Sequence, residues 1–132
     1  MKHLDIIQLS ISLAADATDK DEAYLRNIIG RSYYGVYHHA VAVLEHKLNW
    51  SASPNKYGVH EKVISRLDGH PSNLTEDQVK FIESMKQDLI NLKKKRVKAD
   101  YRLLTQVSKA EALFVNKLAV RLVENLEKLP GF

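Results

Sequence analysis

The stretch SKAEALFVNKLAVRLVENLEKL (residues 108–129) shows the helical pattern of this 132-residue chain most clearly. Its apolar residues recur every three or four positions, which is the repeat of a helix with one buried face: Val115, Leu118, Leu122, Leu126 and Leu129. Ser108 and Glu111 stand three residues apart before this repeat, as in the capping box of a helix start. We therefore expect a helix that ends near residue 129.

The rest of the chain shows the same repeat. We expect four further helices, over residues 4–17, 22–48, 59–67 and 75–98. Two of the three prolines and two of the five glycines fall in the loops between them. No alternating strand of useful length appears, although the tyrosine and β-branched side chains of residues 32–43 make the helical pattern less distinct there. The predicted fold class is all-α: an up-and-down bundle of four long helices plus one short helix, in a single domain over residues 1–132.

Composition narrows the class of protein. The chain has no cysteine, which excludes disulfide frameworks, thiolate metal sites and cysteine nucleophiles. Hydrophobic residues make up 45% and charged residues 27%, as in an ordinary globular domain, and no apolar run is long enough to span a membrane. Asp5 and Gln8 interrupt the N-terminal stretch where an export signal needs apolar residues. We expect a cytoplasmic protein with no membrane contact.

Positive charge is concentrated in one segment. The chain carries a net charge of +4, yet residues 93–102 hold six basic side chains against one acidic side chain, a local charge of +5. A basic helix on a balanced protein attracts a phosphate backbone, and the candidate contacts are Lys93, Lys94, Lys95 and Lys98. The alternative is a solvated, lysine-rich helix end that complements the helix dipole.

An arginine interrupts the apolar stripe of the helix expected over residues 75–98. Arg96 and Ala99 continue a stripe of four apolar residues: Ile82, Met85, Leu89 and Leu92. Burying an unpaired guanidinium is costly, so Arg96 must be paired, stand at the end of the stripe, or face a cleft or a second subunit. Asp100, four residues on, is an available partner if the helix persists that far.

A second polar face lies on the helix expected over residues 22–48. Arg31, Tyr34, Gly35 and His38 share this face, because seven residues advance a helix by nearly two turns. An arginine can hold a phosphate oxygen while an imidazole transfers protons, so the pair suits phosphodiester chemistry. The alternative is that the histidine and tyrosine pack at a helix–helix seam. Gly35 favours close approach of another helix or of a ligand.

Other kinds of site have little support. No HxxxH or HExxH pair occurs, and His38 and His39 point to different faces, so we expect no metal site. The sequence has no glycine-rich phosphate loop, nucleophile elbow or carboxylate dyad, and we expect no cofactor. His60 stands where it can form a hydrogen bond across the mouth of the bundle, and Trp50 is interpreted as a lid over the core edge.

Three segments together resemble one family: RSYYGVYHHA (31–40), YGVHEKVISRL (57–67) and KKRVKADYRL (94–103). In order and spacing they are similar to the HEPN superfamily, small helical domains of prokaryotic defence and toxin–antitoxin systems. The likeness covers about residues 22–126 and is to a branch that carries Arg-x-x-Ala-Asp-Tyr. The matching residues are Ser32, Tyr33, Tyr34, His38, Val59, His60, Arg96, Ala99, Asp100 and Tyr101.

The resemblance implies a helical bundle, commonly a homodimer, and in active members a metal-independent endoribonuclease. Active members carry an arginine followed, after four to six residues, by a histidine. Arg31 and His38 fit this spacing, although Ser32 follows the arginine where active members usually have Asn, Asp or His. The window after Arg96 contains no histidine.

We therefore expect a HEPN-like domain that binds RNA or a nucleotide, with Tyr34, His60, Asp100 and Tyr101 joining the lysines at the site. If the domain is a ribonuclease, His38 is the general acid–base, and Arg31 or Arg96 stabilises the charge on the reacting phosphate. The alternative is a non-catalytic dimerisation or interaction module: an antitoxin, or the partner of a nucleotidyltransferase from the same operon. In that alternative Arg96, Asp100 and Tyr101 form a buried network.

Overall fold

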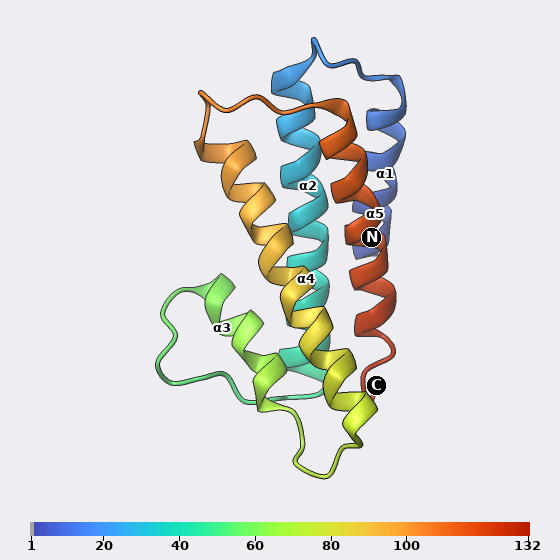
Figure 1. Ribbon diagram of the computed structural model, residues 1–132. Coiled ribbons are helices and arrows are strands. Elements are labelled where there is room, and N and C mark those ends of the chain that lie inside the picture. The colour runs from blue at the N-terminus through green and yellow to red at the C-terminus, as the bar shows by residue number, and fades with distance from the viewer. Residues whose placement is uncertain (1) are drawn as a thin grey trace.

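The computed structural model describes residues 2–132, and every regular element in this range is a helix (Figure 1). The α-helices are α1 (His3–Asp16), α2 (Glu22–Ala40), α3 (Val59–Ser65), α4 (Glu76–Tyr101) and α5 (Lys109–Leu126). A π-helix, η1 (Val41–Lys47), follows α2, and a 3₁₀-helix, η2 (Arg66–Gly69), follows α3. The all-α prediction is confirmed, and residues 32–43 are helical. No helix in this range is both long enough and apolar enough to cross a membrane.

Four of the helices run up and down beside one another. In Figure 1, α1 and α4 rise while α2 and α5 descend, so the α1–α2 and α4–α5 loops lie at the same end. α2 packs against α1, α4 and α5 and is the central helix. The short α3 lies beside the other end of α4. The bundle helices range from 14 residues in α1 to 26 in α4, so the prediction of four long helices is matched only in part.

The predicted apolar stripes form the core. All five residues of the stripe identified in residues 108–129 are buried. The α4 stripe is buried from Ile82 to Leu92, and Arg96 and Ala99 continue it. A fully buried leucine or isoleucine contributes about 1.5–3 kcal/mol relative to an exposed one, so these stripes hold the helices together.

Both helices begin where the capping boxes predict, but only the capping box of α4 is complete. At α4, Gln78 N donates to Thr75 Oγ1 (3.2 Å) and Thr75 N donates to Gln78 Oε1 (2.9 Å). At α5, Glu111 N donates to Ser108 Oγ (3.1 Å), but the Glu111 carboxylate does not return to the Ser108 backbone. It accepts from Lys98 Nζ instead (2.7 Å), so half of the predicted capping box is replaced by a contact between α5 and α4.

The helix predicted over residues 22–48 is not one continuous α-helix. α2 ends at Ala40, and the chain continues as the π-helix η1. The adjacent residues Val43 and Leu44 of this π-helix are both buried. Trp50 N then donates to the carbonyl of Leu44 (2.9 Å), and Trp50, which was interpreted as a lid, is itself buried in the core cluster.

Three other helix ends also differ from the prediction. α3 ends at Ser65, and η2 extends the helical segment to Gly69, past the predicted residue 67. α5 ends at Leu126 rather than at residue 129. α4 extends to Tyr101, beyond the predicted residue 98, because a side chain from α2 binds the carbonyls of its last turn, as described below.

Gly35 marks a very close approach of α1 to α2. A Cβ atom at this position would lie 2.8 Å from Ile7 Cγ1 and 3.3 Å from the carbonyl oxygen of His3. Contacts below 3.0 Å require one of the two atoms to move, so a side chain here would push α1 outward. Of the two expectations for Gly35, the structure shows the approach of another helix.

Candidate functional site

Arg96 lies near the end of α4 and points toward α2. It is only 9% exposed. Its Nε lies 2.9 Å from Asp100 Oδ2, and this predicted ion pair forms because α4 persists past Asp100. Its Nη2 donates to the hydroxyls of Tyr34 (3.3 Å) and Tyr101 (3.4 Å). Of the alternatives left open by the sequence, the structure shows an arginine that is paired within its own chain.

Three tyrosine rings surround the Arg96 guanidinium. Its Cζ lies 5.3, 5.6 and 5.7 Å from the ring centroids of Tyr101, Tyr33 and Tyr34, within the range of cation–π contacts. Burial lowers the pKa of Arg96, but the hydrogen bond to Tyr34 and the nearby phenol and carboxylate oxygens outweigh this, and the net pKa is raised. Arg96 is therefore a fixed cation that joins α2 to the end of α4.

His60 joins this cluster through Tyr33. Tyr33 Oη and His60 Nδ1 are 2.6 Å apart, so the expected hydrogen bond from His60 across the bundle is present and links α3 to α2. Tyr33 is buried, and burial raises the pKa of its hydroxyl above the ordinary value. Burial lowers the pKa of His60, and the positive charges of Arg96 and Lys93 lower it further. The neutral form of His60 is therefore favoured.

The candidate catalytic residues Arg31 and His38 are not joined to Arg96 by a hydrogen bond or ion pair among the described residues, and each has other neighbours. Arg31 is exposed, and its Nε donates to Asn27 Oδ1 one turn earlier (2.7 Å). His38 is also exposed, and its ring stacks 6.2 Å from that of Tyr34. Tyr34 thus stands between His38 and Arg96. Within residues 2–132, no hydrogen bond or ion pair joins any two of Arg31, His38 and Arg96.

Arg26 fixes the end of α4, and the sequence patterns did not single it out. This buried residue of α2 donates from Nη1 to the carbonyls of Lys98 and Ala99 (3.0 Å each). Its Nη2 donates to Glu22 Oε1 (2.8 Å) and to the carbonyl of Thr105. The hydrogen bond from Arg26 lowers the pKa of Glu22. One side chain therefore holds both the last turn of α4 and the loop that leads to α5.

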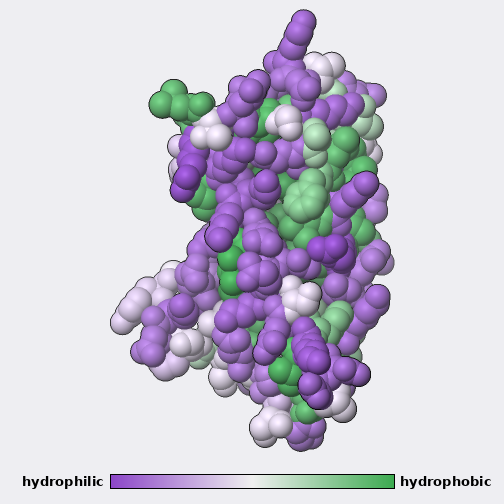
Figure 2. Space-filling model, viewed as in Figure 1, coloured by the Kyte–Doolittle hydropathy of each residue, from purple (hydrophilic) through white to green (hydrophobic). Residues whose placement is uncertain are grey.

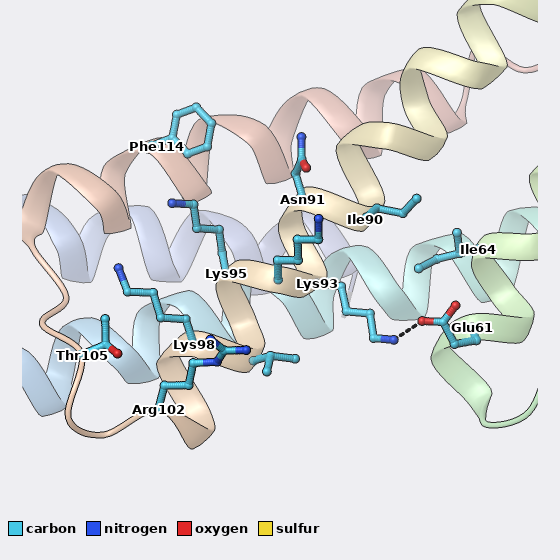
Figure 3. Close-up of a pocket in the computed structure, with 12 residues that line it drawn as sticks. Glu61, Ile64, Ile90, Asn91, Lys93, Lys95, Lys98, Arg102, Thr105 and Phe114 are labelled. Atoms are coloured by element: carbon cyan, nitrogen blue, oxygen red, sulfur yellow. Dashed lines mark hydrogen bonds and ion pairs between the residues drawn. The ribbon is translucent and has the colours of Figure 1, made fainter.

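The predicted lysines lie together in a groove along α4, about 810 Å³ in volume (Figure 3). Residues of α3, α4, α5 and the α4–α5 loop line it: Glu61, Ile64, Ile90, Asn91, Lys93, Lys94, Lys95, Val97, Lys98, Arg102, Thr105 and Phe114. All four lysines predicted to contact phosphate are in this set, and Arg102 adds a fifth cation. The basic segment is thus part of a concave surface.

Acidic side chains neutralise part of the charge in this groove. Lys93 forms an ion pair with Glu61 of α3, seen in Figure 3 as the dashed line. Lys98 Nζ lies 2.7 Å from Glu111 Oε1, and Lys95 Nζ lies 3.9 Å from the same oxygen. The hydrogen bond from Lys93 lowers the pKa of Glu61, so this carboxylate stays ionised at neutral pH. The positive charges of these three lysines are therefore partly neutralised within the chain.

Two cations and one aromatic ring of the groove remain open to solvent. Lys94 and Arg102 are exposed, and no acidic partner for them is found within residues 2–132. Phe114 of α5 lines the same groove and is 53% exposed. The sequence patterns did not single out Phe114, although its position next to Val115, off the apolar stripe, was the available signal.

A separate pair of histidines joins α1 to α2. His3 Nδ1 and His39 Nδ1 are 3.0 Å apart, and His39 Nε2 lies 3.3 Å from Glu127 Oε1. Burial lowers the pKa of both His3 and His39, and the nearby His38 lowers that of His3 further. A contact between two ring nitrogens requires one to donate and the other to accept, so it is lost when both rings are protonated.

Acidification is expected to weaken this junction. Because the pKa values of His3 and His39 are lower in the folded chain, the unfolded chain binds more protons below the ordinary histidine pKa. This contribution to stability is therefore complete above about pH 6.5 and is lost as the pH falls through the folded-state pKa values. The fall in melting temperature from about pH 7.5 to about pH 5 should be smaller in His3→Gln than in the wild-type chain. The exposed His46 supplies the control variant, His46→Gln, and an equal fall in all three chains would contradict the assignment.

Neither a metal centre nor a known relative accounts for these clusters. Among the described residues, no group of three or more His, Cys, Asp or Glu side chains is placed to hold a metal ion. Comparisons of the chain with protein-family models, curated proteins and solved structures found no match. Function must therefore be inferred from the groove and from the residues that shape it.

Proposed function

We propose that this chain is a HEPN-like helical domain that binds RNA through the groove along α4. The observation that carries the proposal is that five cationic side chains line one groove: Lys93, Lys94, Lys95, Lys98 and Arg102. Glu61 is the single acidic residue among the lining residues, and Glu111 beside them pairs with Lys98 and Lys95, so the lining together with Glu111 has a formal charge of +3. A concentrated positive surface on an otherwise balanced chain attracts phosphate groups, and its affinity for them falls as salt rises.

The spacing of these cations suits a linear polyanion better than a small anion. Lys94 and Lys98 are four residues apart in α4, and Arg102, four residues further on, is the first residue beyond the helix, so successive Cα atoms lie about 6 Å apart along the helix axis. The middle cation, Lys98, also binds Glu111. A row of phosphates can contact such a series in turn, whereas a single small anion can use only one or two members. The groove thus favours a nucleic-acid backbone over a free phosphate or a nucleotide.

The HEPN resemblance supports RNA as the polyanion. The Arg-x-x-Ala-Asp-Tyr motif of the resembling branch occupies the last turns of α4, directly behind the cations. Arg96, the first residue of this motif, points toward α2, while the cations face the groove. We therefore assign the motif to holding the end of α4. We assign no cleavage step, since Arg31 and His38 do not form one cluster with Arg96.

Reversing the charge of the two unpaired cations should weaken RNA binding. We expect the double variant Lys94→Glu with Arg102→Glu to bind roughly ten- to a hundred-fold more weakly at about 0.1 M salt. Each lost phosphate contact should also reduce the slope of log affinity against log salt concentration by about 0.7. Fluorescence polarisation with a labelled single-stranded RNA of mixed sequence, titrated at several salt concentrations, measures both quantities.

A variant with the same change in net charge provides the control. Lys20 and Lys128 are exposed and do not line the groove, so Lys20→Glu with Lys128→Glu should retain most of the affinity. An equal loss of RNA affinity in the two double variants would show that the RNA responds to the net charge of the protein alone and not to the groove. Wild-type affinity in the Lys94 and Arg102 variant would equally contradict the proposal. Circular dichroism and melting temperatures confirm that all the proteins are folded.

A further inference from the structure

Phe114 is an aromatic ring exposed within the cationic groove. Val115, the next residue, and Ala112, two residues earlier, are fully buried in the core, whereas Phe114 is 53% exposed and Leu113 before it is 37% exposed. Figure 3 shows the ring at the rim of the groove, above Lys95 and on the opposite wall from α3. The core therefore uses Ala112 and Val115 and leaves Leu113 and much of the Phe114 ring in contact with solvent.

Lys95 covers the Phe114 ring less closely than Lys47 covers the ring of Phe132, the other exposed phenylalanine of the chain. Lys95 Nζ lies 5.9 Å from the Phe114 ring centroid, near the outer limit of a cation–π contact. At Phe132, by contrast, Lys47 Nζ lies only 3.6 Å from the ring centroid and covers it. A flat ligand group can thus reach Phe114 by displacing a flexible, partly exposed lysine.

The groove combines apolar and cationic lining. Ile64, Ile90 and Val97 line it together with Phe114, and the lysines and Arg102 provide the charge. Figure 2 shows this mixture on the face seen in Figure 1, where apolar areas are exposed among the hydrophilic side chains over α4 and α5. Phosphates need the cations and bases need the apolar surface, so the two ligand groups have separate places to bind.

We infer that Phe114 stacks against an unpaired base, so that the groove selects single-stranded over duplex RNA. This inference rests on the proposed function, since it requires phosphates bound to Lys94 and Arg102. Proteins that bind single strands combine a cationic groove with aromatic side chains on which bases stack. In a duplex the bases already stack on one another, and their faces are not accessible to Phe114. Because every base has a ring face, the stacking is tolerant of base identity.

Phe114→Leu tests the inference because leucine keeps an apolar side chain without a ring face. The probes are a labelled single-stranded uridine homopolymer of about 12 nucleotides and a labelled RNA duplex of the same length. We expect affinity for the single strand to fall roughly ten-fold and affinity for the duplex to stay the same. Phe114→Trp, which restores a ring, should bind the single strand at least as tightly as the wild-type chain. A single strand containing 2-aminopurine should lose fluorescence on binding to the wild-type chain and retain more of it on saturated Phe114→Leu.

Phe132→Leu is the matched control, since it removes an exposed phenylalanine beside a lysine, outside the groove. It should leave both affinities unchanged. If Phe114→Leu binds the single strand like the wild-type chain, or loses affinity for single strand and duplex equally, the stacking inference is wrong while binding in the groove stands. If the wild-type chain binds neither RNA, or Lys94→Glu with Arg102→Glu has no effect, the proposed function fails as well. Melting temperatures near that of the wild-type chain show that the variants are folded.

Discussion

Replacing Arg26 with alanine should lower the melting temperature of this chain by roughly 10 °C. Arg26 is 9% exposed, and its guanidinium donates to the carbonyls of Lys98, Ala99 and Thr105. The last carbonyls of a helix have no partner within the helix, so another group must satisfy them. Alanine removes this donor from all three carbonyls at the junction of α2, α4 and the α4–α5 loop. The Lys98 carbonyl keeps its hydrogen bond from Arg102 N (3.1 Å), whereas the carbonyls of Ala99 and Thr105 lose the guanidinium that binds them.

The size of this effect follows from the unpaired groups. A buried polar group without a partner costs about 1–3 kcal/mol. The Glu22 carboxylate also loses its charged partner but keeps the hydrogen bond from Val107 N (3.2 Å). Water reaches part of this junction, because Thr105 is exposed and Glu22 is partly exposed, so we expect a total loss near 3 kcal/mol rather than the full sum. At this chain length about 1 kcal/mol changes the melting temperature by roughly 3–5 °C.

Arg31→Ala is the matched control for Arg26→Ala, since it removes an arginine from the same helix. Arg31 is exposed, and within the described residues its side chain forms a hydrogen bond only with Asn27. The melting temperature of Arg31→Ala should therefore differ from that of the wild-type chain by about 1–2 °C at most. Arg26→Lys should retain little of the lost stability, because an ammonium group cannot reach carbonyls on both sides as a planar guanidinium does. Equal melting temperatures for Arg26→Ala and Arg31→Ala would show that Arg26 does not hold the end of α4.

Most of the bundle could be predicted because its helices are specified by local patterns. The stripes of α4 and α5, the Thr75 cap and the Arg96–Asp100 pair all depend on residues three or four positions apart. Helix geometry fixes where such residues lie relative to one another, so no knowledge of the tertiary structure was needed. The change to a π-helix after Ala40 was not predictable in this way, because the burial of Val43 and Leu44 depends on how this segment packs against the other helices.

Three of the four contacts of Arg26 could not be predicted, because these partners are backbone carbonyls at least 72 positions away along the chain; only Glu22, four residues earlier, is a local side chain. A carbonyl has no residue type, so no sequence motif records that it accepts a hydrogen bond. The same limit applied to the α5 cap. Ser108 and Glu111 have the spacing of a capping box, but the Glu111 carboxylate binds Lys98 of another helix.

The candidate site was predicted as a charge cluster but not as a surface. The run of lysines indicated where positive charge lies, and all four lysines line one groove. Which of them have partners depends on Glu61 and Glu111, which belong to other helices. The spacing of Arg31 and His38 was correct for a helix face, yet Arg31 turns back to Asn27, and a shared face did not bring either residue to Arg96.

Arg96→Ala should lower the melting temperature by roughly 5–10 °C without loss of RNA affinity in the groove. The guanidinium is almost fully buried and is bound by Asp100, Tyr34 and Tyr101. Removing one partner of a buried ion pair typically costs about 3–5 kcal/mol. Asp100 keeps 31% of its side-chain surface exposed, so water can solvate it after the change, and we expect about 2–3 kcal/mol. The packing of three tyrosine rings around the guanidinium is lost as well.

Lys94→Ala separates this structural role from a binding role, because Lys94 and Arg96 are two residues apart on the same helix. Lys94 is exposed in the groove, so Lys94→Ala should weaken RNA binding and leave the melting temperature within about 1–2 °C of the wild-type value. Arg96→Ala should do the reverse when binding is measured well below its melting temperature. An Arg96→Ala variant that melts like the wild-type chain but no longer binds RNA would make Arg96 a ligand contact and the tyrosine network a binding site. If Arg96→Ala loses only stability and Lys94→Ala loses only RNA affinity, the two faces of α4 have different roles. The face toward α2 stabilises the bundle, and the face toward the groove binds the phosphates.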